Sequence, residues 1–297
     1  MKTSDFYYDL PQELIAQDPL EDRSSSRLMH LSLKDGSIEH RHFTDILDYL
    51  HKGDCLVIND TKVIPARLIG EKEGTGGKVE VLLLKRKGND VWETLVKPGK
   101  KMKPGARVSF GDGLLKGEVL EVVEEGNRLI HFEYEGIFEE ILDQLGQMPL
   151  PPYIKREDTK DDRGTYQTVY ARDDKAGSVA APTAGLHFTP ELRAQMASAG
   201  VEWAEVTLHV GYGTFSPVRC EDIREHVMHE EFVEVPQATV DAIGKAKAEG
   251  RPVIAVGTTS ARTLEGVAGA HGGELTAHQG WINCFIWPGY RFHVLDG

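Results

Sequence analysis

A change of pattern along residues 67–150 constrains the fold of this chain more than any other feature. Within this stretch, short runs of β-forming residues are separated by glycines, and the runs cover residues 78–84, 91–96, 107–110, 115–120 and 128–134. Five or six short strands joined by glycine turns are typical of a small antiparallel barrel. We therefore predict a small antiparallel β-barrel domain over residues 67–151.

The sequence on either side of this stretch alternates strand patterns with helix patterns, as α/β domains do. Strands are predicted over residues 55–58, 178–181, 201–209 and 252–256. One helix is predicted from the N-cap Thr189 to Gly200, another over residues 237–249, and a third is capped by residues 257–260. We predict a mixed-sheet α/β main domain, formed by residues 1–66 and 152–297, into which the barrel is inserted.

Composition excludes several classes of protein. The 297 residues carry 34 basic and 47 acidic side chains, a net charge of -13, which argues against coating nucleic acid by bulk electrostatics. The three cysteines are too widely separated for a disulfide framework or a cysteine-zinc site. No apolar run approaches the ~18 residues of a membrane-spanning helix, and the N-terminus lacks a signal-peptide pattern. We expect a cytoplasmic monomer without membrane association.

One local stretch is basic despite the acidic total. Between Lys97 and Arg107 five basic residues occur with no acidic residue among them, on a loop rich in proline and glycine. Such a loop can approach phosphate groups, or it can be a solvated surface loop. The candidates for phosphate contact are Lys100, Lys101 and Lys103.

Three loops of the predicted α/β domain each follow a strand, at the place where open α/β sheets bind ligands. They span residues 182–189, 209–215 and 256–265. The third loop brings hydroxyl groups to a helix N-terminus, which favours an anion, although a plain helix cap explains them equally well. The candidate binding residues in the three loops are Thr183, Gly185, Gly211, Gly213, Thr214, Thr258, Thr259, Ser260 and Arg262.

Two of these loops also carry histidines, the side chains whose ordinary pKa lies closest to neutral pH. His187 and His209 are therefore candidate acid and base groups, against the alternative that each is a satisfied structural residue. Arg262 either clamps a carboxylate or phosphate or is an ordinary helix-surface arginine. His226, His229 and Glu231 show only a weak metal-ligand spacing, and we expect no metal.

The chain resembles the S-adenosylmethionine:tRNA ribosyltransferase-isomerases of the queuosine pathway. The resemblance covers residues 6–297 and is most specific over residues 181–188, 209–215, 225–229, 256–260 and 288–292, together with residues 10–17, 26–28 and 59–67. Several long motifs in the same order are far more specific than any one short match. Members of the family continue beyond Leu295-Asp-Gly297 with a segment of the Asn-Phe-His-Leu-Pro type, and site residues from that segment are not assigned here.

The resemblance implies an enzyme that moves and isomerises the ribosyl part of S-adenosylmethionine onto 7-aminomethyl-7-deazaguanine at the tRNA wobble position. The implied products are epoxyqueuosine-tRNA, adenine and methionine, with S-adenosylmethionine as co-substrate and no other cofactor or metal. In that chemistry one of His187 and His209 supplies the base and the other the acid, and Arg262 with the nearby hydroxyls holds a carboxylate or phosphate. The resemblance also implies that Asn59, Asp60 and Arg67 line the cleft.

Three alternatives remain open. An RNA methyltransferase would use the same S-adenosylmethionine and release S-adenosylhomocysteine. A non-catalytic tRNA-binding module would use only the basic loop and would consume no cofactor. A metal hydrolase centred on His226, His229 and Glu231 would lose its activity on treatment with a chelator.

Overall fold

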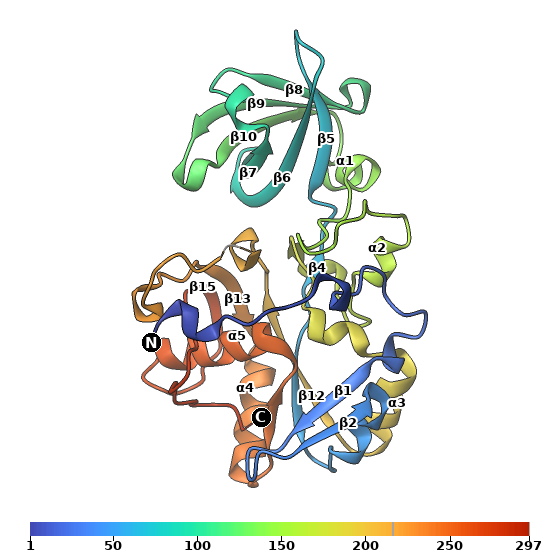
Figure 1. The fold of residues 1–297 in the computed structure, drawn as a ribbon, viewed down its shortest axis with the longest axis vertical. Helices are drawn as coiled ribbons and strands as arrows, with labels where there is room; N and C mark the ends of the chain where they lie inside the picture. The colour runs from blue at the N-terminus through green and yellow to red at the C-terminus, as the bar shows by residue number, and fades with distance from the viewer. Residues whose placement is uncertain (216, 297) are drawn as a thin grey trace. The chain divides into compact units, whose positions relative to one another are not determined.

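The computed structural model describes residues 1–215 and 217–296. Its internal contacts divide the chain into two units, shown as a ribbon in Figure 1. The first unit contains Met1–Lys62, Tyr153–Lys155 and Thr165–Gly297, and the second contains Val63–Pro152 and Arg156–Gly164. The second unit is therefore inserted into the sequence of the first.

The second unit contains a closed six-stranded barrel, which confirms the predicted barrel. Its strands are β5 (Arg67–Lys72), β6 (Gly77–Gly88), β7 (Val91–Lys97), β8 (Arg107–Phe110), β9 (Leu115–Val122) and β10 (Arg128–Tyr134). They pair antiparallel in the order β10-β7-β6-β5-β8-β9. Alternate side chains point inward, as in the buried Leu83, Phe110 and Phe132. Gly70 allows close packing, because a Cβ there would lie 2.5 Å from the Phe110 ring.

Further elements complete the second unit and its borders. Helix α1 (Phe138–Leu145) stacks Phe138 on the Trp92 ring of the barrel, with ring centroids 5.7 Å apart. Helix α2 covers Asp162–Thr165, and Arg156 donates two hydrogen bonds to the buried carboxylate of Asp162, at 2.7 and 2.8 Å. The two short strands β4 (Lys62–Val63) and β11 (Ala176–Ser178) pair with each other.

The first unit is built on a mixed five-stranded sheet, as predicted. The order is β14 (Val253–Ala255), β3 (Cys55–Asn59), β12 (Glu202–Leu208), β13 (Glu231–Val235) and β15 (His278–Ile282). Strands β14, β3 and β12 run parallel, and β13 lies antiparallel to both β12 and β15. Every residue of β3 is buried, which explains why residues 55–58 are an unbroken apolar run before Asn59.

Helices cover both faces of this sheet. Side chains of α4 (Gln237–Ala248) and α5 (Gly257–Ala270) pack in one core cluster with Val57 and Val206, whereas α3 (Pro190–Ser198) packs with Leu56 and Ile58 in another. A hairpin of β1 (Arg27–Leu31) and β2 (Ile38–His42) precedes the sheet. Within the described part of the chain, no helix has the length and apolar composition needed to cross a membrane.

Local predictions in this unit were partly right. Thr189 does cap α3, since its hydroxyl accepts a hydrogen bond from Leu192 N at 3.1 Å. The strand predicted over residues 178–181 is wrong, because the strand lies at Ala176–Ser178. Helix α5 already begins at Gly257, with Val256 as its N-cap and no side-chain capping bond, so the predicted cap by residues 257–260 is also wrong.

Candidate functional site

The candidate site lies at one edge of the five-stranded sheet. The carboxyl ends of the parallel strands β14, β3 and β12 meet there, and each strand continues into one of the polar segments that begin at Val256, Asn59 and His209. Because β13 runs antiparallel, its first residue, Glu231, arrives at the same edge. This edge is where open α/β sheets bind their ligands.

His209 is held by a chain of hydrogen bonds from three segments. Its Nδ1 lies 2.9 Å from the Thr61 hydroxyl, which lies 3.0 Å from the Ser178 hydroxyl. Ser178 in turn accepts a hydrogen bond from Val210 N at 2.8 Å. When Thr61 donates to Ser178, its oxygen accepts from Nδ1–H of His209, and Nε2 of the ring keeps its lone pair.

The surroundings of His209 favour its uncharged form. Burial lowers the pKa of His209, the charge of Lys175 lowers it further, and Glu234 opposes them. The ring stacks on Phe232, with centroids 5.6 Å apart and planes at 15°. Gly177 gives the ring room, because a Cβ there would lie 3.1 Å from Nε2. A neutral, oriented histidine of this kind can accept a proton.

Asn59 and Asp60 are engaged with strand β12. The Asn59 amide donates to Leu208 O and accepts from Leu208 N, both at 3.0 Å, so this side chain extends the β3–β12 pairing. The buried Asp60 accepts from the Thr207 hydroxyl at 2.7 Å, and burial raises its pKa. These contacts with β12 give Asn59 and Asp60 a structural role within the sheet.

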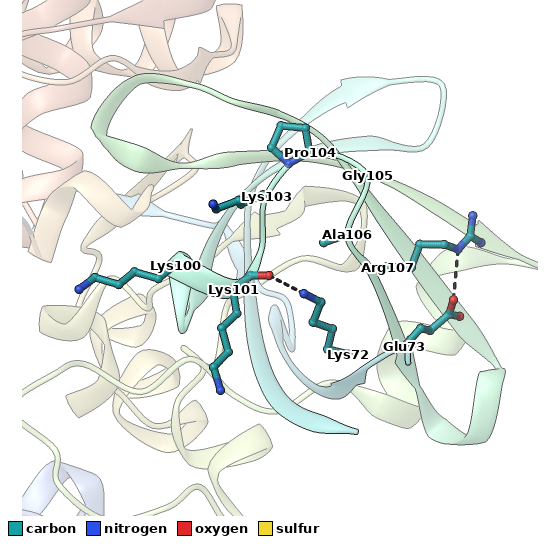
Figure 2. Close-up of a pocket in the computed structure, with 9 residues that line it drawn as sticks. All are labelled: Lys72, Glu73, Lys100, Lys101, Lys103, Pro104, Gly105, Ala106 and Arg107. Carbon is teal, nitrogen blue, oxygen red and sulfur yellow. Dashed lines mark hydrogen bonds and ion pairs between the residues drawn. The ribbon is translucent and has the colours of Figure 1, made fainter. Parts of the chain in front are cut away.

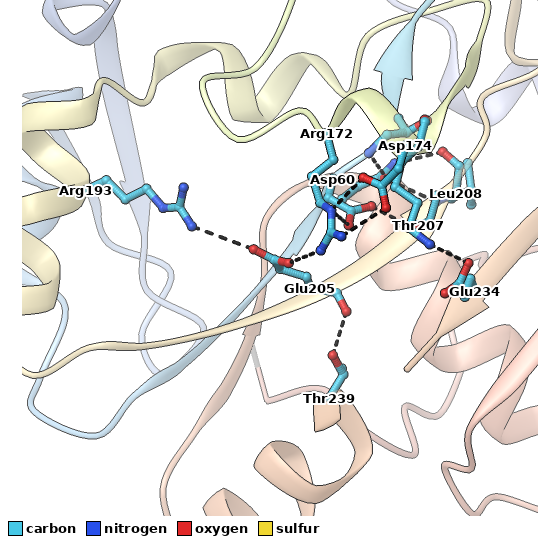
Figure 3. A network of polar contacts seen from close by, with 12 residues as sticks. Asp60, Arg172, Asp174, Arg193, Glu205, Thr207, Leu208, Glu234 and Thr239 are labelled. Atoms are coloured by element: carbon cyan, nitrogen blue, oxygen red, sulfur yellow. Dashed lines mark hydrogen bonds and ion pairs between the residues drawn. The ribbon is translucent and has the colours of Figure 1, made fainter. Parts of the chain in front are cut away.

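A group of charged side chains surrounds Asp60. Figure 3 shows Arg172 and Asp174 beside Asp60, and Glu205 pairs with both Arg172 and Arg193.

Glu231 joins the loop after His209 to helix α5. It is 1% exposed, and its Oε1 accepts from Gly211 N at 3.0 Å and from the Thr214 hydroxyl at 3.3 Å. Its Oε2 pairs with Nη1 of Arg262. Burial raises the pKa of Glu231, but His229, Arg262 and the Gly211 N–H together outweigh burial and hold the pKa below its usual value. Arg262, with 12% of its side chain exposed, is therefore a largely buried ion-pair partner and not a surface arginine.

The three hydroxyl groups at the start of α5 differ in their hydrogen bonds and in their exposure. Ser260 donates back to Val256 O at 3.0 Å, whereas Thr258 is exposed. The hydroxyl of Thr259 is buried and has no hydrogen-bond partner among the described residues. Gly257 adopts a φ of 85°, and a Cβ there would lie 3.1 Å from Ala184, so the 183–187 segment approaches the helix start closely.

His187 lies in this 183–187 segment, apart from the His209 network. The segment forms the short helix Thr183–His187, and the His187 ring packs on Phe43 with centroids 5.2 Å apart. Gly185 is buried against the Tyr170 hydroxyl, which leaves no space for a Cβ, and Thr183 is exposed. His209 is bonded to Thr61, whereas His187 packs on Phe43, so the two candidate histidines occupy different surroundings.

The remaining candidates lie in the second unit. The Arg67 guanidinium donates to Gln147 at 2.9 Å and to Glu80 at 3.1 Å, so its hydrogen bonds are made within the second unit. Lys100, Lys101 and Lys103 are exposed and line an open depression of 570 Å³ with Lys72 (Figure 2). Arg107 lies in the same depression but is paired with Glu73, Glu118 and Glu133. The three lysines have no acidic partner in the described structure, and they make this surface positive.

The histidine and carboxylate motif at residues 226–231 is not arranged as a metal centre. His226 packs against Phe285 at 5.0 Å, and the Glu231 oxygens are occupied as described. His229 Nε2 lies 3.4 Å from Oε1 of Glu231, at the limit of hydrogen bonding. Over the described residues, no group of three His, Cys, Asp or Glu side chains is placed to hold a metal ion.

Several residues of the site were missed at the level of sequence. Thr61 and Ser178 orient His209, and Lys175 and Glu234 tune its charge, yet none of the four belongs to a motif that indicates this role. Glu231 was considered only as a metal ligand. The one available clue was that Thr61 follows a buried strand directly after Asn59 and Asp60.

Comparison with known proteins gives a consistent result. Residues 3–297 match the family described as queuosine biosynthesis protein. The chain is 60% identical over 296 residues to the S-adenosylmethionine:tRNA ribosyltransferase-isomerase of Acetivibrio thermocellus, covering all of this chain and 85% of that protein. The Clostridioides difficile protein of the same name is 57% identical over 296 residues, again with 100% and 85% coverage. The crystal structure of S-adenosylmethionine tRNA ribosyltransferase from Thermotoga maritima is 35% identical, with a TM-score of 0.48, covering 99% of this chain and 82% of that one.

Proposed function

The chain belongs to the queuosine biosynthesis protein family of S-adenosylmethionine:tRNA ribosyltransferase-isomerases, and we propose that it moves and isomerises the ribosyl part of S-adenosylmethionine onto 7-aminomethyl-7-deazaguanine at the wobble position of tRNA. The products are epoxyqueuosine-tRNA, adenine and methionine. The observation that carries this proposal is the hydrogen-bonded His209 at the sheet edge that receives ligands in α/β folds, where burial lowers its pKa.

His209 acts as the general base in this proposal. The positive sulfonium of S-adenosylmethionine acidifies the neighbouring C5′ protons, so a base that is uncharged at neutral pH can remove one of them. The lowered pKa of His209 keeps it unprotonated, and the bond from Nδ1 to Thr61 leaves Nε2 to take the proton. The carbanion-like C5′ is then the atom from which the rearrangement of the ribosyl group starts.

His187 is the proposed acid that assists the departure of adenine. A leaving purine departs more easily when one of its nitrogens is protonated. His187 lies at the end of the 183–187 segment, whose Ala184 approaches the first residue of α5. Thr183 and Gly185 in the same segment are proposed to contact the substrate.

The amino-acid end of S-adenosylmethionine is assigned to helix α5. Its carboxylate suits the positive end of the helix, the hydroxyls of Thr258 and Thr259, and the guanidinium of Arg262. The Ser260 hydroxyl was also a candidate, but it already donates to Val256 O. Gly213 lets the loop after His209 pack closely on His229, because a Cβ there would lie 2.5 Å from that ring. Gly211 and Gly213 are proposed to contact the substrate. Thr214 completes this loop.

The tRNA is proposed to contact the exposed lysines of the barrel. Replacing Lys100, Lys101 and Lys103 with glutamate is expected to weaken tRNA binding by at least about tenfold at low salt, because each lost phosphate contact removes a released counterion. Filter-binding or fluorescence titrations across salt concentrations measure both the affinity and its salt dependence. Charge reversal at Lys34, which is exposed in the turn between β1 and β2, serves as the control. Unchanged tRNA affinity in the triple variant would remove this surface from the proposal.

The decisive experiment follows the cofactor products. The purified protein is incubated with S-adenosylmethionine and with tRNA that carries either 7-aminomethyl-7-deazaguanine or unmodified guanine, and the products are separated by chromatography. Adenine and methionine that appear only with the modified tRNA support the ribosyl transfer. S-adenosylhomocysteine in their place would make the protein a methyltransferase, and no turnover with intact tRNA binding would favour a binding module.

We also propose that the enzyme acts in the cytoplasm, where its tRNA is found, and that it acts as a monomer.

A further inference from the structure

Glu231 is a buried carboxylate whose two oxygens have separate tasks. Its Oε1 accepts from Gly211 N at 3.0 Å and from the Thr214 hydroxyl at 3.3 Å, and His229 lies beside the same oxygen. These contacts prevent the carboxylate from rotating. Oε2 is thereby directed at Arg262, to which it is paired. With 1% of its surface exposed, Glu231 contacts solvent hardly at all.

Arg262 is held at two of its three nitrogens. Nη1 pairs with Glu231, and Nε donates to the backbone carbonyl of Cys284 at 3.1 Å. The third nitrogen, Nη2, is buried and finds no acceptor among the described residues, and the same holds for the Thr259 hydroxyl one turn earlier on α5. Residues three apart lie on one face of a helix, so both unpaired donors belong to the same face.

Buried donors without an acceptor are unfavourable, and native structures contain few of them. A planar guanidinium fixed at Nε and Nη1 presents Nη2 in one direction, which suits an oxygen of a carboxylate. A metal ion does not suit this place, because the guanidinium already pairs with the Glu231 carboxylate, and no group of three possible ligands is found among the described residues.

We infer that Glu231 is a positioning residue for the methionyl carboxylate of S-adenosylmethionine: it holds Arg262 so that Nη2 donates to that carboxylate, with the Thr259 hydroxyl as the second donor. The inference rests on the proposed function, because it names S-adenosylmethionine as the ligand. In this arrangement Arg262 contacts the substrate, and Glu231 acts only by holding Arg262 in place.

The first test compares the effect of one substitution on KM for S-adenosylmethionine with its effect on KM for tRNA. Replacing Glu231 with glutamine keeps the shape of the side chain but removes the charge that holds Arg262, so KM for S-adenosylmethionine is expected to rise about tenfold or more, while KM for tRNA stays within about twofold. Direct titration with S-adenosylmethionine alone should show the same loss of affinity. A Glu231→Gln protein that folds and keeps its KM for S-adenosylmethionine would overturn the inference.

A double-variant cycle then tests whether Glu231 works through Arg262. If it does, Glu231→Gln adds almost nothing to KM for S-adenosylmethionine in an Arg262→Gln background. Removing both charges together also avoids an unpaired buried charge, so the double variant should fold even if Glu231→Gln does not. Losses that multiply would show that Glu231 acts independently of Arg262, and a double variant with the normal KM for S-adenosylmethionine would show that Arg262 does not contact the substrate; either result overturns the inference.

A matched control comes from the second unit. Asp162 is also a buried carboxylate paired with an arginine, Arg156, so Asp162→Asn breaks a comparable ion pair outside the site. It should lower the melting temperature and leave KM for S-adenosylmethionine unchanged. If the unaltered enzyme neither binds nor consumes S-adenosylmethionine, the proposed function fails. If the unaltered enzyme does both, and the Glu231→Gln variant has the same KM for S-adenosylmethionine, this inference fails and the proposed function stands.

Discussion

Replacing His209 with asparagine is expected to lower kcat for adenine release by a factor of about 10² to 10⁴, the usual contribution of a general base. Asparagine can keep a hydrogen bond to Thr61, whose hydroxyl lies 2.9 Å from Nδ1 of His209, but it cannot accept a proton at neutral pH. Single-turnover release of adenine from S-adenosylmethionine measures the effect, and S-adenosylmethionine binding should be nearly unchanged. The same substitution at His187 should also lower kcat, and a normal rate for the His209 variant would shift the base to His187.

The pH dependence gives an independent check on His209. The active form is the neutral imidazole, and its pKa in the folded protein lies below the ordinary value of 6.5. Activity should therefore persist as pH falls through 6.5 and decline only below it, at the lowered pKa. Replacing Lys175 with glutamine removes a charge that lowers this pKa, so the acidic limb should move to higher pH, whereas Glu234→Gln should move it to lower pH. An acidic limb unaffected by either change would contradict the assignment.

Replacing Glu265 with glutamine is expected to lower the free energy of unfolding by about 2–4 kcal/mol, because hydrogen bonds to a buried charged group are worth more than neutral ones. The fully buried carboxylate accepts from the backbone nitrogens of His293, Val294 and Leu295, at 2.8, 3.0 and 3.1 Å. One oxygen of the carboxylate becomes an NH₂ group in glutamine, and a donor then faces a donor. These bonds attach residues 293–295 to helix α5.

Calorimetry should show a melting temperature lower by roughly 5–15 °C. Hydrogen exchange should also show faster exchange at residues 293–295 than elsewhere in the first unit, because their amides lose their acceptors. Glu191→Gln, an exposed change in α3, provides the control and should stay within about 0.5 kcal/mol. Equal stability of the Glu265 and Glu191 variants would show that the carboxylate is dispensable for holding residues 293–295.

Prediction from the sequence succeeded where structure depends on neighbouring residues. The short β-forming runs 78–84 and 91–96, separated by glycines, indicated the barrel strands β6 and β7, and the unbroken apolar run 55–58 indicated the buried β3. The Thr189 cap and the class of fold followed from the same local rules. The boundaries predicted for the two domains remain predictions.

Prediction failed where local patterns were ambiguous. Residues 178–181 are apolar enough for a strand, but the backbone leaves the strand after Ser178, and Val179 instead bonds Val210. At α5 the row of hydroxyls resembled a cap, yet Gly257 with its φ of 85° already starts the helix. In both places contacts with distant segments outweigh local propensity.

The sequence established which residues have suitable chemistry, since His209, Arg262 and the glycine-rich loops were recognisable as motifs and through family resemblance. Only the folded structure shows which residues they contact, because Thr61 and His209 are 148 residues apart along the chain, and Glu231 and Arg262 are 31 residues apart. Parallel strands bring their carboxyl ends together irrespective of their order along the chain. Burial at that edge then lowers the pKa of His209 and shields the Glu231–Arg262 pair from solvent, and neither burial nor charge proximity can be read from residues considered one segment at a time.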